Sequence, residues 1–236
     1  MSETPLPAII AKAEPDWAAV MRTPIQAVTE PLVKIVEQPR LQARSAYFAD
    51  QIPGALPDIW LRAGVAKRLE TVLSLLPAHL GLRLLDGWRP YEVQVALRDI
   101  VAAELVAQMP EASAAERLQV LNQFVAMPST DADAPSPHLT GGSVDLTLFE
   151  VATDEAIDMG SAFDSAELAS WTAFYEAEAT RAGAINQHRR LLCHAMAAAG
   201  FTNLPTEWWH FDCGNQLWAH YSGQTHALYA AAELLP

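Results

Sequence analysis

Two segments of the sequence bring histidine and carboxylate side chains together in a pattern suited to a metal ion. His138 and Asp145 lie seven positions apart across a Gly-Gly turn, and Glu207 and His210 flank two tryptophans. Two imidazoles and one carboxylate form a three-ligand set for Zn²⁺ that leaves a fourth position to water, as in catalytic zinc sites. Zinc lowers the pKa of bound water to about 7, and Glu207 would be the spare carboxylate that takes its proton. These residues indicate metal-assisted hydrolysis.

The residue types alone leave a plainer interpretation open. Histidines are common at surfaces and in cores where a polar neighbour satisfies them, and we assign the other five to that class: His79, His188, His194, His220 and His226. Residues three apart share a face on a helix but not on a regular strand, so an extended segment would need a bulge to aim Glu207 and His210 at one point. Spacing by itself does not decide between the two interpretations.

The elements that must position these side chains are helices and short strands. Apolar residues recur at helical spacing over 65–76, 93–105 and 118–125, which predicts three helices. The apolar run 82–85 ends at an Asp-Gly turn, which predicts a buried strand leading into the loop that carries Arg89. Turn-forming residues then fill 128–137, and we expect a surface loop there.

The second half of the chain is also predicted to contain both strands and helices. Residues 144–149 alternate polar and apolar, which predicts a strand with Asp145 and Thr147 on one face. Ser165 is expected to cap a helix that bears apolar residues over 168–175, and a further helix should end at Gly200. We expect a last strand over 201–211 and then an Ala-rich tail that suits a helix.

Without regular βαβ alternation, these elements predict a single α+β domain over residues 1–236. Six prolines punctuate the first 40 residues, which we expect to form an extended N-terminal arm. The chain is 51% hydrophobic and 18% charged, enough apolar material for a core and unlike a disordered chain.

Charge and targeting signals narrow the class of partner. The net charge of −13 opposes any polyanion, so we exclude nucleic acid as a partner. The N-terminus lacks the basic and apolar regions of a signal peptide and no stretch suits a bilayer, so we expect a cytoplasmic protein without a membrane partner. Cys193 and Cys213 do not make a disulfide framework. Their redox state and the oligomeric state stay open.

Three motifs together resemble the VanX-type D-alanyl-D-alanine dipeptidase family, zinc peptidases that share a fold with hedgehog-like and D,D-carboxypeptidase domains. The motifs are Asp-Gly-Trp-Arg-Pro at 86–90, Ser-x-His-x-x-Gly-x-x-x-Asp at 136–145 and Glu-Trp-Trp-His at 207–210. Their order and spacing agree with the family, and the resemblance extends over residues 45–212 in outline. It implies a small, mostly antiparallel sheet that carries the zinc site and is flanked by helices.

The resemblance also implies roles for individual residues. His138, Asp145 and His210 correspond to the ligands of one zinc ion. Glu207 corresponds to the general base and acid, and Arg89 to the arginine that stabilises the oxyanion.

Two further positions correspond to substrate-binding residues, Ser136 and Asp164. Asp164 would pair with the ammonium of a free dipeptide, which disfavours longer chains because an extra residue would leave this carboxylate buried and unpaired. A helix cap ahead of Ser165 is the alternative for Asp164. Tyr47 is a candidate for the family's entrance residue, with core packing as its alternative.

We therefore predict a zinc dipeptidase that cleaves D-Ala-D-Ala, or a similar small dipeptide, by attack of Zn-bound water. A zinc D,D- or L,D-carboxypeptidase acting on peptidoglycan stem peptides is the first alternative, and a non-catalytic zinc-binding module is the second. Glu207 and Arg89 argue against the second, because a structural zinc site closes its fourth position and needs neither. Pro137, Gly142 and residues 211–216 differ from relatives in the family, which leaves side-chain selectivity open. The sequence also leaves the exact dipeptide, its stereochemistry and the physiological role open.

Overall fold

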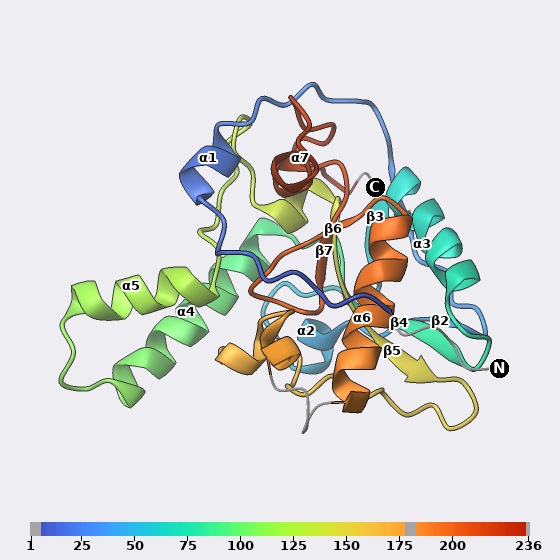
Figure 1. Cartoon of the computed structure of the whole chain (residues 1–236). Helices are drawn as coiled ribbons and strands as arrows, with labels where there is room; N and C mark the ends of the chain where they lie inside the picture. Colours follow the sequence, from blue (N-terminus) through green and yellow to red (C-terminus); the bar gives the residue numbers. More distant parts are fainter. Residues whose placement is uncertain (1–5, 178–182, 235–236) are drawn as a thin grey trace.

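The computed structural model describes residues 6–177 and 183–234 and shows the predicted α+β domain (Figure 1). The helices are α1 (Trp17–Met21), α2 (Ala46–Ala49), α3 (Ala63–Leu75), α4 (Tyr91–Gln108), α5 (Ala114–Phe124), α6 (Gly183–Ala198) and α7 (Gln216–Ser222). The strands are β1 (Leu32–Lys34), β2 (Leu41–Ala43), β3 (Trp60–Arg62), β4 (Leu80–Asp86), β5 (Ser143–Glu150), β6 (Thr202–Asn203) and β7 (His210–Asp212). Single 3-10 turns are η1 (Pro137–Thr140), η2 (Leu168–Ser170) and η3 (Phe174–Ala177).

A five-stranded sheet in the order β2-β4-β5-β7-β6 forms the centre of the molecule, and β1 and β3 make a separate antiparallel pair. Only β2 and β4 run parallel in the larger sheet, which confirms a mostly antiparallel arrangement. The main core includes apolar side chains of β4 and β5 together with those of α3 and α6. Strand β5 is buried from Ser143 to Phe149, so its polar residues point into the protein and not toward solvent.

The three helices expected from apolar spacing are present as α3, α4 and α5. Helix α5 begins with a capping box in which Ser113 and Glu116 exchange hydrogen bonds with each other's backbone. Together α4 and α5 form a hairpin that extends away from the sheet (Figure 1, green). Within the described ranges, no helix has the length and apolar character needed to cross a membrane.

The helix expected after Ser165 is absent, and this prediction is wrong. Residues 164–177 form only the turns η2 and η3. Asp164 has a left-handed backbone with φ of 60°, and the Ser165 hydroxyl donates to Glu167 and does not cap a helix. Carbonyl groups of this segment bond to Arg189 of α6, which replaces the hydrogen bonds a helix would have supplied.

The expected strand over 201–211 is likewise interrupted. Strands β6 and β7 pair antiparallel, with Thr202 opposite Asp212, and a turn lies between them. The side-chain amide of Asn203 donates to the carbonyls of Glu207 and His210, which stabilises that turn.

Both ends of the chain also differ in detail from the sequence-based expectation. The expected N-terminal arm contains α1 and β1, and its residues 1–5 lie outside the described part. The Ala-rich tail after Gly223 is not helical over 224–234, because it runs beside residues 24–28 and bonds to their backbone. Cys193 and Cys213 are both free thiols.

Candidate active site

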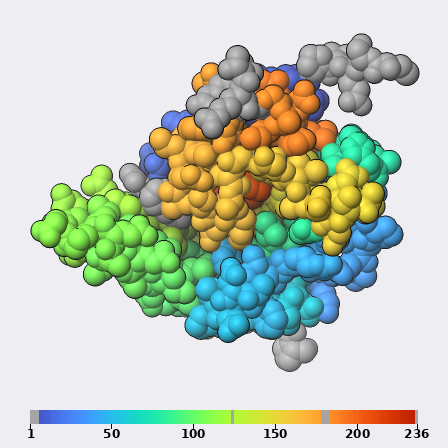
Figure 2. Space-filling model, turned by 90° about the horizontal axis from the view of Figure 1, so that it is seen from below, coloured from blue at the N-terminus to red at the C-terminus, as the bar shows by residue number. Residues whose placement is uncertain are grey.

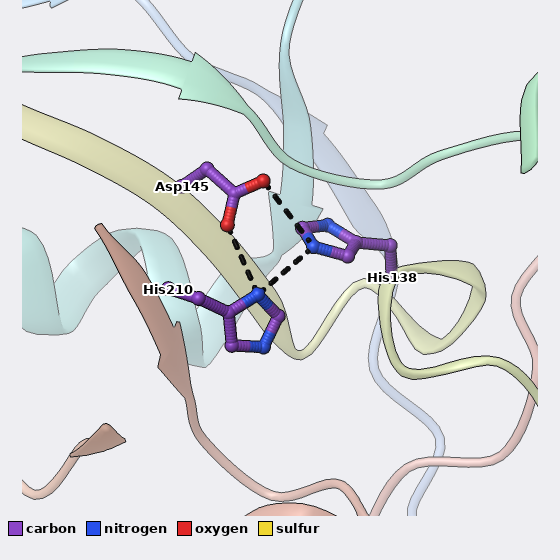
Figure 3. A group of neighbouring side chains, drawn as sticks. All are labelled: His138, Asp145 and His210. Carbon is purple, nitrogen blue, oxygen red and sulfur yellow. Dashed lines mark hydrogen bonds and ion pairs between the residues drawn. The ribbon is translucent and has the colours of Figure 1, made fainter. Parts of the chain in front are cut away.

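Three side chains from different elements converge at one end of the sheet (Figure 3). Asp145 of β5 lies directly opposite His210 of β7 in the strand register, and η1 contributes His138. Their potential ligand atoms all lie within 4.8 Å of one another, and all three residues are buried. We call these three residues the metal cluster.

The distances between potential ligand atoms of the metal cluster match those between atoms that bind one metal ion. His138 Nε2 lies 3.2 Å from His210 Nδ1. The two Asp145 oxygens lie 3.0 Å from His210 Nδ1 and 3.4 Å from His138 Nε2. Two ligand atoms bound tetrahedrally to one zinc ion at its usual bond lengths lie about 3.3 Å apart.

The outward nitrogens of both histidines already have acceptors. His138 Nδ1 donates to the Gly87 carbonyl at 2.8 Å, and His210 Nε2 donates to both Asp212 oxygens at 3.1 Å. When both rings are neutral, these partners keep the ring protons on the outer nitrogens, so His138 Nε2 and His210 Nδ1 are free to bind a metal ion. The Asp145 carboxylate lies 3.0 Å from His210 Nδ1 as the third potential ligand. The donor set therefore fits a zinc ion, and the carbonyl and carboxylate partners fix the ring orientations.

Asp212 is itself held in place, although sequence reasoning did not single it out. The residue is fully buried, and its Oδ1 accepts from Ser143 Oγ at 2.7 Å and Asn215 Nδ2 at 2.6 Å. A detectable signal existed in the sequence, because residues two apart on a strand share a face and His-x-Asp therefore places the carboxylate beside the imidazole.

Glu207 reaches the same point from the turn that precedes β7. Its Oε2 lies 3.9 Å from His210 Nδ1, and 27% of its side chain is exposed. Because residues 204–209 form a turn, the difficulty of aiming Glu207 and His210 from one regular strand does not arise. Burial among neighbouring groups raises the pKa of Glu207 to about 8, with Asp145 and Asp164 adding to the effect and His210 opposing it.

Arg89 is buried beside the cluster with each guanidinium nitrogen engaged. Nε donates to Asp86 Oδ2 at 2.8 Å, and Nη1 donates to Gln94 Oε1 at 2.6 Å. Nη2 lies 3.4 Å from Asp145 Oδ2 and 3.3 Å from the Tyr47 hydroxyl. These contacts hold the cation at a fixed position next to the metal cluster.

Tyr47 links Arg89 to Asp164. Its hydroxyl donates to Asp164 Oδ2 at 3.2 Å, and its ring packs against Phe163, with the ring centres 5.9 Å apart. No helix begins at Ser165, so the helix-cap interpretation of Asp164 is wrong.

Asp164 is exposed to solvent, but its carboxylate is surrounded by protein atoms. The residue is exposed, yet protein atoms crowd its carboxylate, and this desolvation raises the pKa of Asp164 to about 6. The residue is thus partly open to solvent, while its carboxylate packs against protein atoms. Figure 2 shows a recess in one face of the molecule, between the yellow-orange segment and the blue segment, with part of the red C-terminal region at its floor.

Ser136 lies next to the cluster in sequence but bonds within its own loop. Its Oγ accepts from the Ser129 amide at 2.8 Å and lies 3.3 Å from the carbonyls of Met127 and Ser129. The hydroxyl closes the loop that leads into η1. A substrate-binding role for Ser136 stays a prediction.

Comparison with known proteins places these features in a family. The profile of the D-ala-D-ala dipeptidase family, Peptidase M15, matches residues 61–230. A D-alanyl-D-alanine dipeptidase of Synechocystis is 32% identical over 226 residues, which is 86% of this chain and 90% of that protein. A D-alanyl-D-alanine dipeptidase of Streptomyces coelicolor is 34% identical over 169 residues, 70% of this chain and 75% of its own.

A solved vancomycin-resistance D,D-pentapeptidase in complex with Zn(II) also resembles this chain, with a TM-score of 0.48 and 15% identity over 89% of this chain and 96% of that one. The family assignment rests on the sequence matches.

Proposed function

Because this chain belongs to the D-alanyl-D-alanine dipeptidase family of M15 peptidases, we propose that it hydrolyses D-Ala-D-Ala or a similar free dipeptide. His138, Asp145 and His210 would hold one zinc ion through the three inward-facing ligand atoms. When bound, zinc polarises the scissile carbonyl and makes water a nucleophile at neutral pH. The remaining steps belong to side chains of the chain itself.

Glu207 is the proton carrier in this proposal. It lies beside the metal cluster, with Oε2 3.9 Å from His210 Nδ1, and 27% of its side chain is exposed. As a carboxylate it accepts a proton from the attacking water, and as an acid it delivers that proton to the departing amine. Its raised pKa suits both roles near neutral pH, where an ordinary glutamate would be a poor acid.

Arg89 supplies positive charge where the carbonyl oxygen becomes negative. Asp86 and Gln94 hold the guanidinium in advance, so little reorganisation is needed when charge develops. One such donor is typically worth about 3 kcal/mol of transition-state stabilisation.

Asp164 is the acceptor for the ammonium of the substrate. Its carboxylate and the Arg89 guanidinium both contact the Tyr47 hydroxyl, and the residue is exposed to solvent. An anionic group at this position attracts a free amino terminus and disfavours an acylated one. This arrangement favours a dipeptidase over a carboxypeptidase.

The observation that carries the proposal is the convergence of two imidazole nitrogens and the Asp145 carboxylate at one buried point, with Glu207 next to them. The test is to load the purified protein with zinc and measure hydrolysis of D-Ala-D-Ala, L-Ala-L-Ala, N-acetyl-D-Ala-D-Ala and a muramyl pentapeptide. We expect rapid cleavage of free D-Ala-D-Ala alone. Equal cleavage of the pentapeptide would favour the carboxypeptidase, and cleavage of none would refute the proposal.

A further inference from the structure

One buried guanidinium holds both ends of the loop that carries Asp164. Arg189 of α6 is 1% exposed, and its Nε donates to the carbonyl of Met159 at 2.7 Å. Nη1 donates to the Trp171 carbonyl at 2.7 Å, and Nη2 to the Ala169 carbonyl at 2.6 Å. A single side chain thus ties position 159 to positions 169 and 171. We call residues 159–172 the Asp164 loop.

The Asp164 loop needs such a tie because its own backbone supplies little regular structure. Asp164 stands midway between Met159 and Ala169, and it adopts a left-handed backbone that costs a non-glycine residue free energy. A segment without helix or strand bonds keeps high conformational entropy unless outside contacts fix it. The position of the Asp164 carboxylate therefore depends on what fixes the ends of the loop.

Two further contacts support the same end of the loop. The Tyr175 hydroxyl donates to the Gly160 carbonyl at 2.7 Å, and the Trp208 indole donates to Ser161 Oγ at 2.9 Å. The Arg189 guanidinium lies over the Tyr175 ring, 4.9 Å from its centre. Trp208 also stands next to Glu207 in the sequence, so these contacts connect the Asp164 loop to the turn that carries the proton carrier.

The guanidinium is suited to this task in a way that an ammonium is not. Its planar fork directs five N–H donors along fixed directions, so it can reach carbonyls at two separate points of the backbone at once. Burying a cation among neutral carbonyls is expensive, and an apolar side chain of similar size often gives a fold equal or greater stability. An apolar side chain could not hold the Asp164 loop in this geometry, because it has no donors for the loop carbonyls.

We propose that Arg189 is a positioning residue that fixes the Asp164 carboxylate at the place where a dipeptide's ammonium can bind. This inference rests on the proposed function, since it assigns to Arg189 part of the selectivity for a free amino terminus. Arg189 touches neither substrate nor metal in this account and acts only through the Asp164 loop.

The test is Arg189→Lys, which keeps the charge and loses the fork. We expect KM for D-Ala-D-Ala to rise about tenfold with kcat changed less than about twofold, because ammonium binding weakens while the metal cluster is untouched. KM for an N-acetylated dipeptide should not change, and zinc content should stay at the wild-type value. A lower melting temperature with unchanged KM would overturn the proposal.

A double-mutant cycle with Asp164→Asn separates positioning from general damage. If Arg189 acts through Asp164, then Arg189→Lys should raise KM by less than about twofold in the Asp164→Asn background. Full additivity would contradict the inference. Arg190→Lys is the matched control, because this adjacent residue of α6 pairs with Glu176 and not with the loop, and it should leave KM unchanged.

Tyr175→Phe serves if Arg189→Lys does not fold. It removes only the bond to the Gly160 carbonyl, and we expect KM to rise about threefold with kcat retained. An unchanged KM in this variant would also refute the inference.

The failure of the proposed function and the failure of the inference give different results. If wild-type protein cleaves no free dipeptide, the proposed function fails and the inference fails with it. If Asp164→Asn raises KM and the loop variants do not, only the inference fails.

Discussion

The two halves of the proposed site are built by different means. The metal cluster stands on β5, β7 and η1, where strand pairing sets Asp145 directly opposite His210. The Asp164 loop has no strand or α-helix and depends on side chains that bond to its backbone from α6. In the proposed function, the three metal ligands therefore lie on paired strands and a 3-10 turn, whereas the ammonium-binding residue lies on a loop that side chains of α6 hold in place. Changes to the first half should abolish turnover, and changes to the second should alter selectivity.

The largest effect should follow from loss of a metal-cluster side chain. In Asp145→Asn the ligand set loses its formal charge, so we expect zinc affinity and activity to fall together, the activity by about 10³-fold or more at limiting zinc. Wild-type protein should bind close to one zinc per chain by metal analysis. Full zinc content with full activity in the variant would show that the metal lies elsewhere.

Glu207→Gln should separate catalysis from metal binding within the same half. The amide keeps the shape and cannot accept the proton, so turnover should fall by about 10²-fold or more while zinc content is unchanged. Since burial raises the pKa of Glu207 and only the carboxylate is a base, wild-type kcat/KM should rise with pH along an acid limb above the ordinary glutamate range. In Glu207→Gln this rise of kcat/KM with pH should be absent. If the variant keeps the rise, a group other than Glu207 causes it.

The Glu207 turn shows where sequence reasoning reached its limit. The motif indicates which residues meet, and the structure brings Glu207 and His210 to one point. How they meet depends on Asn203, whose amide bonds to two carbonyls of the turn. These two hydrogen bonds from a side chain of the neighbouring strand β6 stabilise a turn in place of a continuous strand, and residue spacing does not contain that information.

The segment after Asp164 shows the same limit more strongly. Ser165 and the apolar residues that follow satisfy the local pattern of a capped helix, yet Arg189, many residues later, takes the carbonyls of Ala169 and Trp171. Local propensity is a weak prior that tertiary contacts override. By contrast, the helical spacing of apolar residues predicts α3 and α4, and the alternation of polar and apolar residues predicts β5, from the local sequence alone.

A smaller effect is expected from Asp212, which supports the metal cluster without touching the metal. In Asp212→Ala the outer nitrogen of His210 loses its acceptor, and zinc affinity should fall about 10- to 100-fold. Competition with a chelator measures this directly. Asn215→Ala, which removes one donor to the same carboxylate, should show a weaker loss in the same direction. Equal zinc affinity in wild-type protein, Asp212→Ala and Asn215→Ala would show that Asp212 contributes to packing and not to metal binding.

The smallest effect should be a pH dependence confined to the recognition half. Burial raises the pKa of Asp164 to about 6, with repulsion from Asp145 adding to the shift and Arg89 opposing it. The carboxylate therefore loses its charge as pH falls through that value, and KM for free D-Ala-D-Ala should rise between pH 7 and pH 5, by at most about tenfold per pH unit. In Asp164→Asn this rise should disappear. A rise that persists in the variant would assign it to another group.

The most direct test of the whole account is the ratio of kcat/KM for D-Ala-D-Ala to that for N-acetyl-D-Ala-D-Ala, measured in wild-type protein and in Asp164→Asn at equal zinc content. We expect a wild-type ratio of about 10² or more, because acetylation removes the charge that Asp164 binds. The variant should have a ratio close to unity. A wild-type ratio near unity, or a ratio unchanged by Asp164→Asn, would contradict the claim that this site selects a free dipeptide through its ammonium.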